Sequence, residues 1–103
     1  MSLTQQQVED TKREFAANFE LTGKTPAAVA ADLHITTTKL ERLMTLQQQS
    51  LNDPWILRNY LLQAVTAAGE TPIPFTALSG DWHRHWFLDA DAIDRGHMTA
   101  GDY

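Results

Sequence analysis

The chain has 103 residues, of which 43% are hydrophobic, and its 8 Lys and Arg against 13 Asp and Glu give a formal net charge of -5. This length predicts one small domain with one hydrophobic core, which excludes a large two-lobed enzyme. The absence of cysteine excludes disulfides, thiolate chemistry and cysteine-ligated metal centres. The acidic balance argues against a strongly basic nucleic-acid binder, because cationic contacts to phosphate supply most non-specific affinity.

The N-terminal residues lack the basic region and apolar stretch of a secretory signal. No apolar run approaches the roughly 20 residues of a membrane-spanning helix. We therefore expect a cytoplasmic protein without membrane contacts.

Two short-range patterns predict the first two helices. Thr4 and Gln7 have the spacing of a capping box, which starts a helix that Gly23 ends. A second helix is expected over residues 26–33, because Thr25 can cap it and the proline that follows fits the first helical position.

Two further helices are expected over residues 37–46 and 54–68. The first of these alternates apolar and polar residues at helical spacing. The second begins with Asp53 as the expected N-cap before a proline and ends at Gly69. Its expected core side chains are Trp55, Leu57, Leu61, Leu62 and Val65.

The C-terminal segment, residues 70–103, is divided by prolines and glycines but keeps many aromatic residues, which a disordered tail would lack. We expect it to pack on the same core as residues 1–69. Residues 81–88 fit a helix, with Trp82 and Trp86 on one face, and fit a strand equally well.

Residues 29–43 carry a pattern of small and apolar side chains that can hold two short helices at a fixed crossing, namely Ala30, Leu33, Ile35, Leu40 and Leu43. This pattern resembles the helix-turn-helix of repressor-like DNA-binding domains, here over residues 26–46. His34 occupies the turn position where such motifs usually have Gly, so a positive φ is expected there at a cost of about 1 kcal/mol.

The resemblance implies that residues 37–46 enter the major groove of DNA. The side chains that would face the DNA are Thr37, Thr38, Lys39 and Arg42, with Lys24 adding a contact to the backbone.

The chain also resembles a family of small bacterial domains of unknown function. The segments that carry this resemblance are NFEL at 18–21, DPWILRNYL at 53–61, PFTAL at 74–78 and GDWHRHWFLD at 80–89. The resemblance supplies no activity.

Trp82, Trp86 and Phe87 either cover the core of one chain or form a homodimer interface. Nearby lies the one group of residues that could bind a metal ion, namely Asp81, His83, His85, Asp89 and Asp91. Because a His-x-His pair often arises by chance, we predict neither a metal nor another cofactor. The chain has no nucleophile elbow, phosphate loop or paired-carboxylate motif, so we predict that it is not an enzyme.

The predicted fold is an all-α, repressor-like bundle of four to five helices with an ordered aromatic C-terminal segment. Its first predicted function is binding of double-stranded DNA by a homodimeric transcriptional regulator, since two copies span two half-sites. The alternative is a protein-interaction module that keeps the helix-turn-helix scaffold without binding DNA.

Overall fold

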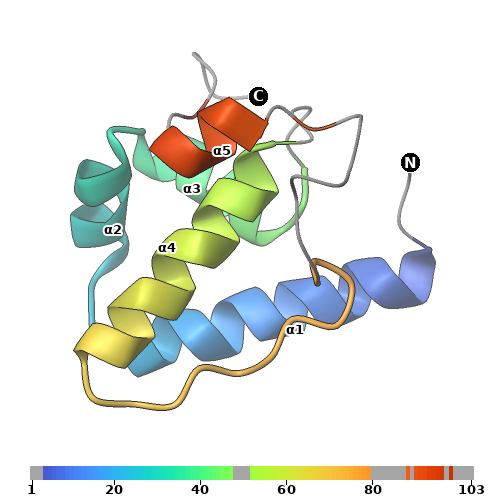
Figure 1. Ribbon diagram of the computed structural model, residues 1–103, viewed down its shortest axis with the longest axis horizontal. Coiled ribbons are helices and arrows are strands. Elements are labelled where there is room, and N and C mark those ends of the chain that lie inside the picture. The colour runs from blue at the N-terminus through green and yellow to red at the C-terminus, as the bar shows by residue number, and fades with distance from the viewer. Residues whose placement is uncertain (1–3, 48–51, 80–87, 89, 97, 99–103) are drawn as a thin grey trace.

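The computed structural model describes residues 4–47, 52–79, 88, 90–96 and 98. Within these residues the protein is all-helical, which confirms the all-α prediction (Figure 1). The helices are α1 (Gln5–Thr22), α2 (Pro26–Leu33), α3 (Thr37–Met44), α4 (Asp53–Ala67) and α5 (Ala90–Arg95).

Helix α4 lies at the centre and packs against α1, α3 and α5 (Figure 1). The core cluster joins its buried face to Phe15 of α1 and to the buried residues of α2 and α3. Four of the five predicted core residues of α4 are buried, and Leu62 is partly buried against the same cluster. The core residues of α4 in this cluster are Trp55, Ile56, Leu57 and Leu61.

The predicted caps form. The side chain of Thr4 accepts a hydrogen bond from the backbone N–H of Gln7 at 3.1 Å, and the side chain of Gln7 accepts one from the backbone N–H of Thr4 at 2.9 Å. Gly23 ends α1 at a φ of 68°, and the Thr25 hydroxyl caps α2. These ends are set by local hydrogen bonds, which explains why sequence spacing predicted them.

Two helix ends differ from the prediction. Helix α3 ends at Met44 rather than at Leu46, which has a φ of 56°. Helix α4 begins at Asp53 rather than at the proline after it, and Asn52 occupies the N-cap position. The prediction that Asp53 is the cap is therefore wrong, because Asp53 is the first helical residue and its carboxylate reaches α3.

The segment 70–79, here called the strap, runs along α1 (Figure 1). The buried amide of Asn18 donates a hydrogen bond to the carbonyl of Ile73 at 3.0 Å and accepts one from its N–H at 2.9 Å. The buried carboxylate of Glu14 accepts hydrogen bonds from the N–H and the hydroxyl of Thr76. Because polar side chains hold the strap, the buried face of α1 is more polar than an ordinary amphipathic helix.

Apolar contacts complete the attachment of the C-terminal region. The ring of Phe75 meets that of Phe15 edge-on, with centroids 5.4 Å apart. Leu78, Leu88 and Ile93 belong to the same core cluster as the helices. The open choice between helix and strand at residues 81–88 falls, apart from Leu88, outside the described residues.

Candidate functional site

Helices α2 and α3 are joined by a tight turn of residues 34–36. His34 adopts the left-handed conformation, with φ 58° and ψ 42°, as expected for the turn position. The N–H of Ile35 donates to the carbonyl of Ala30 at 3.0 Å, and Thr36 caps α3 through the N–H of Lys39. The side chains expected between the helices are buried or, for Ile35, partly buried. The turn therefore fixes how α3 is presented, and helix-turn-helix remains our interpretation of it.

Most of the predicted DNA-contacting residues lie on the surface. Thr37, Thr38 and Arg42 are exposed on α3, and Lys24 is exposed before α2. Glu41 is exposed on the same helix, so this surface of α3 offers one cation and one anion. A surface of this kind lacks the excess of positive charge that attracts phosphate.

The prediction that Lys39 faces DNA is wrong, because its side chain does not face outward. It is 1% exposed, and its Nζ lies 3.2 Å from Oδ2 of Asp53, which is itself 0% exposed. A buried charge needs a partner of opposite sign, and Asp53 supplies it. Lys39 therefore cannot extend to a DNA base or phosphate while this structure is kept.

The outer side of α3 borders a groove of about 350 Å³, here called the α3 groove. Its apolar lining comes from Phe19, Pro26, Leu40 and Met44. Its polar lining comes from Thr37, Thr38, Glu41 and Thr45. Apolar walls with a few polar groups at the edge are typical of binding sites for side chains or small ligands.

Other cations near the N-terminal half are engaged by carboxylates. Lys12 pairs with Glu9 at 3.1 Å, Arg13 with Asp10 at 2.7 Å, and Lys24 with Asp32 at 2.9 Å. These pairs cancel local charge, so a phosphate would compete with a carboxylate already in place.

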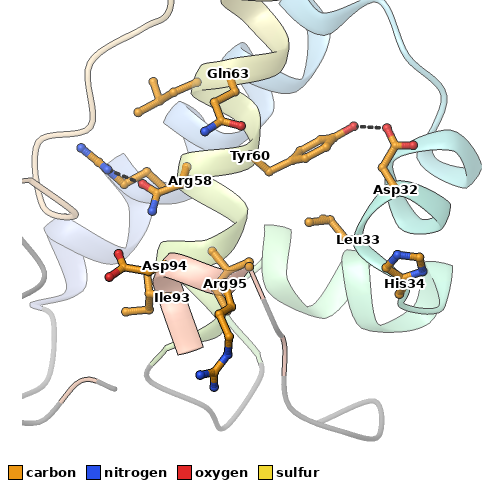
Figure 2. A pocket seen from close by; sticks show the side chains of 13 residues that line it. Asp32, Leu33, His34, Arg58, Tyr60, Gln63, Ile93, Asp94 and Arg95 are labelled. Atoms are coloured by element: carbon orange, nitrogen blue, oxygen red, sulfur yellow. Dashed lines mark hydrogen bonds between the residues drawn. The ribbon is translucent and has the colours of Figure 1, made fainter. Parts of the chain in front are cut away.

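Lys24 belongs to a small surface cluster that also contains Asp32 and Tyr60. The Tyr60 hydroxyl donates to Asp32 Oδ2 (Figure 2), and the Lys24 ammonium lies 5.8 Å from the Tyr60 ring centroid. Hydrogen bonds from Tyr60 and Lys24 lower the pKa of Asp32, and the bond to Asp32 raises the pKa of Lys24. Burial raises the pKa of Tyr60, so its hydroxyl is the proton donor in this cluster.

The remaining predicted sites fall largely beyond the described residues. Trp82, Trp86 and Phe87, the expected protein interface, lie outside them. So do the proposed metal ligands except Asp91, which is exposed on α5. Over the part of the chain that the structure describes, no three His, Asp or Glu residues gather to hold a metal ion. The same residues contain no helix long and apolar enough to cross a membrane.

Two features of the site escaped the sequence analysis. The Lys39–Asp53 pair was missed, although Lys39 lies four residues before buried Leu43 and so shares its helical face. The stacking of Arg58 on Trp55 was also missed, and these residues are three apart on α4.

The described residues thus define a small all-helical domain built around α4, with an apolar groove beside α3. The chain belongs to the DUF2316 family, described as uncharacterized proteins conserved in bacteria, whose model matches residues 1–89. This assignment confirms the resemblance to a bacterial family of unknown function. No curated protein and no solved structure matches the chain.

Proposed function

We propose that this protein is a protein-interaction domain and that the α3 groove is its contact surface. The observation that carries the proposal is the withdrawal of Lys39 into an ion pair with Asp53, which leaves an apolar groove edged by Glu41 as the main feature of the outer side of α3. Apolar burial then supplies the affinity that phosphate contacts supply to a DNA-binding helix.

The chemistry of the groove specifies its partner. A cavity of about 350 Å³ accommodates one or two apolar side chains of a partner segment. Glu41 at its edge and the net charge of -5 favour a segment that also carries Lys or Arg. The expected partner is therefore a peptide segment with an apolar anchor beside a basic residue.

Selection from a random peptide library on the purified protein tests this proposal. We expect enrichment of peptides with an apolar anchor next to Lys or Arg. Their affinity should fall at least about tenfold in Thr38→Arg, which places a long cation at the groove. Thr66→Arg is the matched control, because Thr66 is an exposed helical threonine outside the groove.

Binding of DNA is the second candidate. The observation that favours it is the short turn between α2 and α3, which leaves Thr37, Thr38 and Arg42 exposed together. It predicts enrichment of a short motif from randomised duplex DNA, an affinity that falls steeply with salt, and loss of binding in Arg42→Ala. The molar mass of the protein in solution should be measured alongside, since two copies of the chain are needed to contact two half-sites.

These experiments separate the two candidates. A DNA motif lost in Arg42→Ala, with no peptide sensitive to Thr38→Arg, would overturn the protein-interaction proposal. Peptides that distinguish Thr38→Arg from Thr66→Arg, with no duplex bound even at low salt, would support it.

A further inference from the structure

A second hollow of about 640 Å³ lies between α2, α4 and α5, and we call it the α4–α5 hollow (Figure 2). Its polar lining includes Asp32, Arg58, Gln63, Asp94 and Arg95. It shares no lining residue with the α3 groove, so the two places can be tested with separate variants.

Arg58 is the most constrained cation of the hollow. Its guanidinium carbon lies 5.3 Å from the Trp55 ring centroid and 6.0 Å from that of Phe75. Its Nη1 donates to Oδ1 of Asn59 at 2.6 Å. Two rings and an amide therefore hold the guanidinium in place, so little conformational freedom is lost when it binds a ligand.

The guanidinium of Arg58 also lacks the carboxylate partner that a half-buried arginine usually has. Its Nε is buried without a hydrogen-bond acceptor, and no carboxylate of the described residues forms an ion pair with it. Burial lowers the pKa of Arg58, because it removes water from around the charged form. A half-buried guanidinium without a carboxylate partner is a candidate ligand for an anion, which its Nη groups would bind because the Nε is fully buried.

The other charged residues of the hollow are compatible with an anion. The carboxylate of Asp32 is engaged by Tyr60 and Lys24, on the side of the hollow opposite Arg58 (Figure 2). Arg95 lines the hollow from α5 and forms no ion pair with the described carboxylates.

We propose that the α4–α5 hollow binds a small oxyanion, a carboxylate or a phosphate, with Arg58 as its main ligand. Guanidinium groups suit this task because their planar N–H donors match the oxygens of carboxylate and phosphate. The hollow is large enough for a metabolite-sized molecule around that anionic group.

The test uses the full chain labelled with ¹⁵N. Sodium phosphate and sodium malonate are titrated separately at constant ionic strength, and the arginine Nε–H resonances are followed, with that of Arg58 assigned through Arg58→Lys. We expect the Arg58 resonance to shift and saturate with at least one of the two probes. Saturation with phosphate alone or malonate alone identifies the oxyanion, and either result supports the site.

Variants provide the matched comparison. Arg58→Gln should weaken binding of the probe at least about tenfold, whereas Arg42→Gln on α3 should leave it unchanged. If Arg58→Gln fails to fold, the wild-type titration and Arg58→Lys decide the question.

Shifts that stay linear with both probes, or equal binding by wild type and by folded Arg58→Gln, would overturn the proposal. Peptide binding at the α3 groove is measured separately in Arg58→Gln and should be unchanged. Failure of one site is thereby distinguished from failure of the other.

Discussion

The ammonium of Lys39 and the carboxylate of Asp53 form an ion pair of 3.2 Å with almost no solvent exposure. The pair joins the first turn of α3 to the first residue of α4. Removing two charges from water is unfavourable, and their attraction compensates only while both are present. The pair thus adds to the apolar packing of Leu40 and Leu43, which attaches α3 to the centre of the fold.

Lys39→Met should therefore destabilise the protein more than most single substitutions. It leaves the Asp53 carboxylate buried without its cation, so we expect the free energy of unfolding to fall by about 3–5 kcal/mol. Urea denaturation followed by tryptophan fluorescence measures this change. The double variant Lys39→Met, Asp53→Asn should recover part of the loss, and a single variant within about 0.5 kcal/mol of wild type would contradict the ion pair.

Asn18→Ala should loosen the strap. The substitution removes both hydrogen bonds to Ile73, and we expect a loss of about 1–3 kcal/mol in unfolding free energy with faster hydrogen exchange at the Ile73 amide. Gln6→Ala is the control, since the Gln6 amide bonds Asp10 on the exposed surface. Unchanged exchange at Ile73 would show that the strap is held by other contacts.

Tyr60→Phe should raise the pKa of Asp32 toward its ordinary value of 3.8, because the hydroxyl of Tyr60 is the main cause of its lowering. A lowered folded-state pKa stabilises the protein above the unfolded-state value and loses that effect as the pH falls through the folded-state pKa. The pH dependence of stability below about pH 4 should therefore be weaker in Tyr60→Phe. Carboxyl ¹³C titration by NMR measures the pKa directly, and an unchanged value would mean that Lys24 alone sets it.

His34→Gly and Gly23→Ala should change stability in opposite directions. His34 has a φ of 58° in the left-handed region, so glycine there relieves strain of about 1 kcal/mol. Gly23 has a φ of 68° with open space around its Cα, so alanine there adds strain of similar size without a clash. Thermal unfolding compares the two variants with wild type. A destabilised His34→Gly would instead assign His34 a contact that glycine cannot replace.

Sequence alone predicted the features that depend on neighbouring residues. The start of α1 at Thr4, the start of α2 after Thr25 and the left-handed conformation of His34 all follow from local hydrogen bonds and backbone sterics. The core face of α4 followed from helical periodicity.

The candidate site was harder to predict, because its decisive contacts join distant parts of the chain. Charge alone placed Lys39 on the surface, and only the approach of Asp53 explains its burial. Glu14 and Asn18 likewise have the pattern of surface residues until the strap reaches them. The α3 groove depends on α1 contributing Phe19 beside α3, a juxtaposition that no local pattern encodes.

The strap also determines when α1 can form all of its contacts during folding. Its hydrogen bonds join residues that are 55 and 62 positions apart, so Asn18 and Glu14 of α1 lack these partners until the chain has been made as far as Ile73 and Thr76. During synthesis on the ribosome, the side chains of Glu14 and Asn18 stay hydrated until the strap has been made. A fragment ending at Gly69 would lack the strap contacts of Asn18 and Glu14 and the core residues Phe75, Leu78, Leu88 and Ile93.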